Sequence, residues 1–481
     1  MDFATLREDP MRKLTTTALT VAAVSALAAS AAAFEFRPDK ALRVATGLTA
    51  ETLCTDVFIS GLDPATVFAQ AIKARPGVSL VARHITYRVD PEHHAVYAAW
   101  FGRFASRAAL RPGQGCLVVQ GEIPASVGGP TKAEATPQLL PDIAGPAVVE
   151  PTNPGLKAAL DHVFTDPPNA PPRWLRAVVV LTDGKVVAER YAPGIGVGTP
   201  LIGYSASKSV MSTLVGILVR QGKLDVHAPA PVAAWSAPHD PRHAITIDNL
   251  LRMTSGLDVA QTGSGFDPAS RMLFTERDMA GYAEAHKLAR PIGARWDYSD
   301  ASTLIVSRIV RDAAGGDVQA FAKRELFDRL GMTTAILTTD ATGTSVGSTG
   351  ILASARDWAK LGELYARDGL VDGQRILPEG WVRYSGASTL GSSYGAGIWT
   401  NASPDSDAKG RIRAGMPCDM LFASGVLGQR VYIIPSSDVV IVRFGVTQKW
   451  PDFDIAGDER LVREVLEALP AGPRPACGKP G

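Results

Sequence analysis

A serine and a lysine stand three residues apart where an apolar helix begins. In residues 202–222, IGYSASKSVMSTLVGILVRQG, Ser205 and Lys208 share one helix face a single turn apart. The unpaired N–H groups and positive dipole of a helix start stabilise an alkoxide and disfavour an ammonium. A partly desolvated Lys208 is then expected to be neutral and to accept the proton of Ser205. The pair predicts a nucleophile and its base.

The same spacing also fits a structural role, with Ser205 as an N-cap and the stem of Lys208 covering apolar surface. Further motifs therefore matter. The segment RWDYSDAST places Tyr298 just before a helix, in a loop that also holds Trp296. The alternative for Tyr298 is a loop aromatic that covers the core. The segment FASGVLGQRVYIIP places a small-residue strand, Ala423-Ser424-Gly425, near the chain end.

The order of S-x-x-K, the tyrosine loop and the small-residue strand resembles the serine β-lactamases, the DD-peptidases and their relatives. The segment LFASGVLGQRVYIIP resembles in particular the nylon-oligomer (aminohexanoate-oligomer) hydrolases. This resemblance extends over residues 173–469 and does not include the chain before it.

The resemblance implies roles for four positions. Ser205 would be the nucleophile, Lys208 its base, and Tyr298 the group that passes the proton to the leaving group. The N–H groups of Ser205 and Val426, the latter next to Gly425, would form the oxyanion hole.

Two positions depart from the pattern. Asp300 stands where class C β-lactamases have asparagine, and Ala423-Ser424-Gly425 replaces their Lys-Thr-Gly. We expect Asp300 and Trp296 to support the catalytic groups from outside the reacting atoms, and Ser424 to contact substrate.

The elements around these motifs predict an α/β, β-lactamase/transpeptidase-like fold. The segment RAVVVLTDGKVVAERYA predicts a hairpin around Asp183-Gly184, a long helical stretch follows, and strands return before the closing helix DERLVREVLEAL. This order predicts one antiparallel sheet built from both ends of the domain, flanked by helices, with a helical subdomain inserted.

Before this domain, strand-like runs and one helical run, DPATVFAQAIKA, predict a small α+β module. The expected divisions are 1–33 (upstream extension and signal peptide), 34–120 (α+β module), 121–155 (Pro/Gly-rich linker) and 156–481 (hydrolase domain).

The N-terminus predicts export to the periplasm or the cell exterior. Arg12 and Lys13 precede an Ala-rich apolar run that ends in small residues at 31–33, as in a cleaved secretory signal; an uncleaved anchor is the alternative. Export favours disulfides, and the simplest pairing of the four cysteines is local: Cys54 with Cys116, and Cys418 with Cys477. Buried free thiols remain an alternative for the second pair.

Composition argues against other classes of function. The net charge is +1 with no dense basic run, so neither nucleic acid nor an anionic membrane is an expected partner, and no membrane span is expected after signal cleavage. No C-x-x-C pair occurs, and the histidines of HDPRH fit a surface loop, so no metal or other cofactor is expected. GYSAS nearly matches a nucleophile elbow, but an α/β-hydrolase needs a later histidine than His286, the last one here.

We therefore expect an exported serine hydrolase that acts on a small carboxylic ester or linear amide. Ala423 offers no charge to the carboxylate that β-lactam and D-Ala-D-Ala substrates carry; the alternative is that Arg411, Arg413 or Arg430 replaces that charge. The alternatives are a β-lactamase or DD-peptidase, and a penicillin-recognising receptor that is acylated without turnover. The sequence leaves the oligomeric state open.

Overall fold

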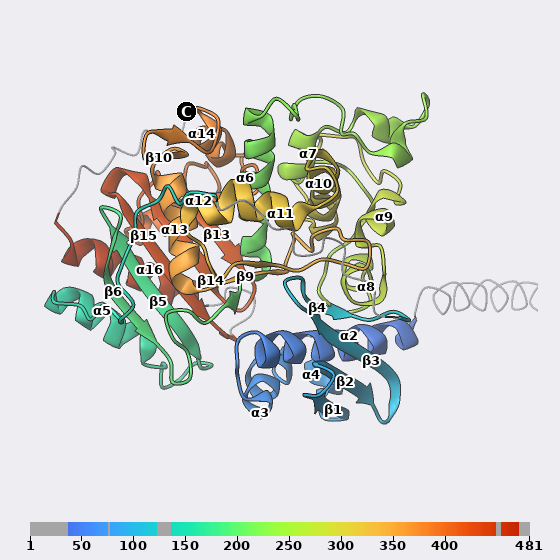
Figure 1. The fold of residues 1–481 in the computed structure, drawn as a ribbon, viewed down its shortest axis with the longest axis horizontal. Coiled ribbons are helices and arrows are strands. Elements are labelled where there is room, and N and C mark those ends of the chain that lie inside the picture. The colour runs from blue at the N-terminus through green and yellow to red at the C-terminus, as the bar shows by residue number, and fades with distance from the viewer. Residues whose placement is uncertain (1–36, 76, 123–135, 449–453, 471–481) are drawn as a thin grey trace, which may run out of the picture.

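The computed structural model describes residues 37–75, 77–122, 136–448 and 454–470. Its centre is a six-stranded antiparallel sheet of order β12-β13-β14-β15-β5-β6 (Figure 1). The strands are β5 (Leu175–Thr182), β6 (Lys185–Tyr191), β12 (Trp399–Thr400), β13 (Leu421–Gly425), β14 (Gln429–Ile434) and β15 (Val439–Gly445). Because β15 pairs with β5, the two ends of the domain form one sheet, as the sequence predicts.

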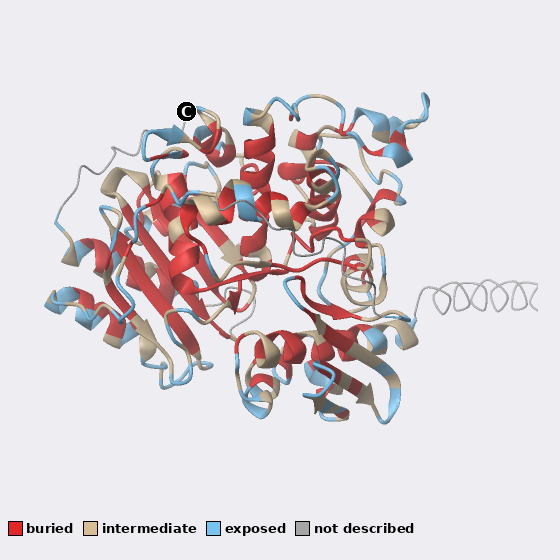
Figure 2. Ribbon diagram, in the orientation of Figure 1, coloured by how far each residue is buried: buried red, intermediate tan, exposed pale blue. Residues whose placement is uncertain are grey.

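The hairpin between β5 and β6 turns at the expected dipeptide. Asp183 and Gly184 have φ values of 49° and 70°, the left-handed conformation that a tight two-residue hairpin turn requires. Along β5, Val178 and Val180 pack against α5 (Pro154–Phe164) and α16 (Ile455–Ala468), while alternate residues face α13 (Ala355–Ala366). Both faces of the sheet are therefore buried (Figure 2).

A helical region is inserted between β6 and the C-terminal strands (Figure 1). Its longer helices are α6 (Ser207–Arg220), α8 (Pro268–Thr275) and α10 (Asp300–Ala313), and its shorter ones are α7 (Ile247–Leu251), α9 (Met279–Glu284), α11 (Val318–Ala322), η5 (Lys323–Phe327) and α12 (Asp328–Leu330). A second small sheet has the order β7-β9-β8, made of Leu201–Ile202, Ile351–Ala353 and Ile336–Leu337. The fold is the α/β architecture expected from the sequence.

The N-terminal residues form a four-stranded antiparallel sheet with helices against it. The strands are β1 (Ile85–Asp90), β2 (Ala95–Trp100), β3 (Arg103–Arg111) and β4 (Gly115–Val118), and the helical segments are α2 (Pro38–Phe58), α3 (Pro64–Val67), η1 (Phe68–Ile72) and α4 (Ser79–Ala82). The expectation of a single helical run is wrong, because α2 precedes it. Residues 44–50 of α2 are all buried, so its sequence has no polar face to mark a helical period.

Buried polar contacts tie this N-terminal module to the rest of the molecule. Asp56 of α2 forms a buried ion pair with Arg176 of β5 at 2.8 Å. Arg111 of β3 donates to the carbonyl oxygens of Thr339 and Asp340. The module thus packs below the helical region and beside the sheet (Figure 1).

Residues 136–155, the described second half of the predicted linker, pack against the domain. Leu140 and Ile143 belong to the main core, and Arg356 of α13 donates to the carbonyl oxygens of Gly145 and Ala147, both at 2.6 Å. This half of the segment is therefore part of the packed domain.

The expected Cys54–Cys116 disulfide is confirmed and joins α2 to β4. Cys477 and the signal sequence lie outside the described residues, so the Cys418–Cys477 pairing and cleavage remain predictions. Within the described ranges, every helix is too short or too polar to cross a membrane. The same residues contain no group of three or more histidine, cysteine, aspartate or glutamate side chains placed to hold a metal ion.

Candidate active site

Ser205 lies in a tight turn between β7 and α6. The turn is η2 (Tyr204–Ala206), a single 3-10 turn, so α6 itself starts two residues after Ser205. A side chain on Gly203 would collide with the ring of Trp358, and one on Gly425 would collide with the Gly203 carbonyl oxygen. These two glycines therefore allow β13 and α13 to approach the turn that carries Ser205.

The structure does not show the N-cap and the solvent-reaching lysine that the structural alternative predicts for this pair. Ala206, not Ser205, is the N-cap of α6, and it makes no side-chain capping bond. The Lys208 side chain is only 2% exposed, so its ammonium does not extend into solvent. Nζ of Lys208 instead donates to Oγ of Ser205 at 3.0 Å and to the carbonyl oxygen of Ser348 at 3.1 Å.

Asp300 controls the charge of Lys208. Oδ1 of Asp300 lies 2.5 Å from Nζ of Lys208, and both side chains are buried. Burial lowers the pKa of Lys208, but the charge of Asp300 and the nearby Tyr298 raise it, and the net result is a raised pKa. The direction of this shift opposes the neutral lysine expected from the sequence, because the sequence argument gave no weight to the carboxylate of Asp300, which stands in place of asparagine.

Gln261 fixes Asp300 from the opposite side. Its amide nitrogen donates to Oδ2 of Asp300 at 2.9 Å, and its amide oxygen accepts from the Asp300 N–H at 2.6 Å. Sequence reasoning missed Gln261, since a single polar residue in a loop rich in Gly, Ser and Thr carries no motif.

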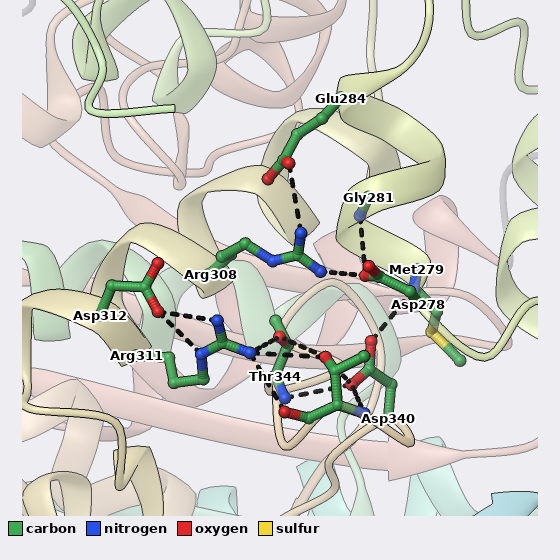
Figure 3. Close-up of polar contacts among 10 residues, drawn as sticks. Asp278, Met279, Gly281, Glu284, Arg308, Arg311, Asp312, Asp340 and Thr344 are labelled. Carbon is green, nitrogen blue, oxygen red and sulfur yellow. Dashed lines mark hydrogen bonds and ion pairs between the residues drawn. The ribbon is translucent and has the colours of Figure 1, made fainter. Parts of the chain in front are cut away.

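A second polar network holds α10, whose first residue is Asp300 (Figure 3). Arg308 on α10 pairs with Asp278 and Glu284 of the α9 segment. Arg311, one turn further along, donates to Oγ1 of Thr344 at 2.9 Å. The loop that contains Thr344 runs on to Ser348, so this network fixes both Asp300 and the carbonyl group that contacts Lys208.

The loop before α10 places Tyr298 beside the lysine. Nζ of Lys208 lies 4.8 Å from the centroid of the Tyr298 ring. Tyr298 packs between Trp296, Tyr394 and Trp399, with ring centroids 5.7–6.2 Å apart. Trp296 thus packs against the Tyr298 ring, and its supporting role at the site stays a prediction.

The β13 strand borders the same cavity as the serine. Ser424, Gly425 and Val426 line it, whereas Ala423 belongs to the main core. The three arginines considered as substitutes for a strand lysine, Arg411, Arg413 and Arg430, are not among the lining residues. Two of them are engaged elsewhere: Arg411 donates to Asn401, and Arg430 lies 3.4 Å from Asp458.

The cavity has a volume of about 750 Å³ and two walls of different origin. Ser205, Tyr298 and Asp300 lie on the wall made by the domain, and the facing wall comes from α2, β4 and the loop around Arg75 in the N-terminal module. Glu51 of α2 also lines the cavity, and burial raises its pKa to about 7. The site therefore combines a serine, a lysine and a tyrosine with a roomy pocket, an arrangement able to acylate a serine hydroxyl.

The family match lies beyond the N-terminal module. Residues 176–467 match the model of the beta-lactamase family. The 6-aminohexanoate-dimer hydrolase of Paenarthrobacter ureafaciens is 26% identical over 319 residues, which cover 63% of this chain and 76% of that protein.

Two solved structures share the fold. The putative 6-aminohexanoate-dimer hydrolase from Bacillus anthracis superposes with a TM-score of 0.56 at 19% identity, over 70% of this chain and 91% of the other. A penicillin-binding protein homologue from Caulobacter crescentus gives a TM-score of 0.51 at 17% identity, over 68% of this chain and all of that one (100%).

Proposed function

Because the chain belongs to the beta-lactamase family and is a serine hydrolase of that superfamily, we propose that it cleaves carboxylic esters or small linear amides through an acyl-enzyme on Ser205. The observation that carries this proposal is the 3.0 Å contact between Nζ of Lys208 and Oγ of Ser205, made inside a cavity large enough for a small substrate.

The proposed reaction has two halves. Oγ of Ser205 attacks the substrate carbonyl carbon while its proton passes to Nζ of Lys208. Tyr298 delivers its proton to the departing oxygen or nitrogen and regains one from Lys208. Water then attacks the acyl-enzyme and releases the acid and free Ser205. The backbone N–H groups of Ser205 and Val426 are placed, in this proposal, to stabilise the oxyanion. Since the pKa of Lys208 is raised, Lys208 must lose a proton before it can act as the base.

The substrate class follows from the strand beside the serine. Ala423 gives no charge-assisted contact to a substrate carboxylate, and Ser424 contributes only a hydroxyl. Losing a charge-assisted contact in a partly buried site costs about 1.5–3 kcal/mol, or about tenfold to a hundredfold in discrimination. The cation that does line the cavity, Arg75, belongs to the N-terminal module, where Glu51 lies on the same wall.

The test compares kcat/KM for a p-nitrophenyl ester, a linear aminohexanoate amide and a chromogenic cephalosporin. We expect the ester or the amide to be preferred, with Ser205→Ala as the inactive control. A preference for the cephalosporin would overturn the substrate assignment, and its loss in Arg75→Ala would trace that preference to the module's cation. A single stoichiometric burst of product without further turnover would instead identify a receptor that is acylated but not deacylated.

Export remains part of this proposal. It is supported by the signal-like N-terminus and by the Cys54–Cys116 disulfide, which persists in oxidising compartments. Intact-mass measurement of protein recovered from outside the cytoplasm should give a chain that begins near Phe34.

A further inference from the structure

The cavity beside Ser205 is completed by a helix that lies outside the matched family region. Helix α2 contributes Ala41, Val44, Ala45, Leu48, Glu51 and Thr52 to the cavity wall. These positions recur every three or four residues, so they form one stripe along the helix. The opposite side of α2 packs on its own sheet; for example, Oγ1 of Thr46 donates to the Phe104 carbonyl oxygen at 2.7 Å.

The position of α2 is fixed against the domain. Gly47 has no side chain, and a Cβ there would lie 3.1 Å from the carbonyl oxygen of Phe274, so glycine allows α2 to approach α8 closely. Tyr204, the neighbour of Ser205, is buried in the same apolar cluster as Leu53 and Cys116 of the module. The module therefore contacts the segment that carries the nucleophile as well as the far end of the cavity.

The stripe has a polar end and an apolar end. Cζ of Arg75 lies 5.6 Å from the centroid of the Tyr204 ring, and Glu51, Arg75 and Tyr204 line the same cavity as Ser205, so the polar end lies on the side of the turn that carries Ser205. The other end reaches Gly265, whose Cβ position lies 3.7 Å from a methyl group of Val44. Between Ala41 and Thr52 the helix rises about 16 Å, so the apolar stretch leads away from the serine.

We propose that the N-terminal module forms the binding wall for an extended apolar chain of the substrate, so that α2 gives this hydrolase a preference for esters or amides of medium-length aliphatic groups. This inference rests on the proposed function of Ser205 and specifies the substrate class of that site. The wall on α2 is apolar for its first four contact positions, and burying each methylene of a bound chain there is favourable.

Two ester series test the inference: p-nitrophenyl esters with acyl chains of about two to ten carbons, and acetates of linear alcohols over the same range. In the intact protein, kcat/KM should rise in one series by about threefold to fourfold for each added methylene until the chain fills the cavity along α2. Whichever series responds identifies the side of the scissile bond that faces α2. A flat or falling profile in both series would overturn the proposal.

Filling the part of the cavity beside α2 should remove the preference for long chains. Ala45→Phe places a ring in the cavity, and we expect kcat/KM for the favoured long chain to fall at least about tenfold while that for p-nitrophenyl acetate changes less than about threefold. Ala41→Phe, at a less buried position of the same stripe, provides a second variant if the first folds poorly. Ala65→Phe, at an exposed position on α3 outside the cavity, is the matched control and should behave as wild type.

Equal losses on short and long chains in both α2 variants would contradict a chain-binding wall. The outcome is separable from the proposed function, because Ser205→Ala reports on that function alone. If acetate hydrolysis depends on Ser205 but chain length has no effect, only the role of α2 fails. If Ser205→Ala keeps full activity, the proposed function fails.

Discussion

In the proposed mechanism, the buried pair of Lys208 and Asp300 sets the pH range in which the site can react. Burial alone would favour a neutral lysine, whereas the carboxylate 2.5 Å from Nζ favours the ammonium. The pair is held by Gln261 on one side and the Ser348 carbonyl group on the other, so neither charge can be solvated by rotation of its side chain. A single side-chain difference, Asp for Asn, thus changes the pH range expected for the site.

Replacing this carboxylate should move the activity toward lower pH. If Lys208 is the base, kcat/KM rises as pH increases through the pKa of Lys208, which Asp300 raises. Asp300→Asn removes the negative charge, burial then dominates, and the pKa of Lys208 falls. We expect the rising limb of the pH profile to shift by about one to three units to lower pH.

The matched control is Asp297→Asn. This is the same change three residues earlier, in the loop before α10, at a carboxylate paired with Arg290. Its pH profile should match that of the wild type. An unchanged or alkaline-shifted limb in Asp300→Asn, with the fold intact by circular dichroism, would mean that Lys208 is not the titrating base.

At the scale of elements, the central sheet was predictable and the module helix was not. Asp183-Gly184 and the apolar strands around it gave a strong local signal. The antiparallel sheet and the family resemblance are both confirmed. Helix α2 escaped detection because its faces are buried by two different partners, which leaves no amphipathic period.

The same distinction applies within the candidate site. The three-residue spacing of Ser205 and Lys208 predicted their contact because one helical turn fixes it. The charge of Lys208 and the role of Gln261 both depend on contacts with Asp300. Lys208 and Gln261 lie 92 and 39 residues from Asp300 in the sequence, and no local pattern encodes contacts over such separations.

At the scale of the whole molecule, the N-terminal module and the domain share the pocket. Their joint apolar cluster includes Tyr204 and Leu427 from the domain with Leu53 and Ile72 from the module. Stability of the module should therefore affect the geometry around Ser205, and the Cys54–Cys116 bridge is the covalent link that stabilises the module.

Removing this bridge should destabilise the protein measurably. It closes a loop with a sequence separation of 62, for which the chain-entropy relation gives about 4 kcal/mol. We expect the double variant Cys54→Ala, Cys116→Ala to unfold at lower urea concentration, with a free energy of unfolding smaller by about 3–4 kcal/mol. Wild type with its bridge intact, unfolded in urea under the same non-reducing conditions, is the control. An unchanged midpoint would show that the bridge contributes little to the module.

The identity of the acylated residue is the most direct test of the account. Wild-type protein, treated with a fluorophosphonate and digested, should carry the added mass on the peptide that contains Ser205, and Ser205→Ala should carry none. Hydrolysis of p-nitrophenyl acetate should disappear in parallel with labelling. Adduct on another residue, or undiminished turnover by Ser205→Ala, would contradict the assignment of Ser205 as the nucleophile.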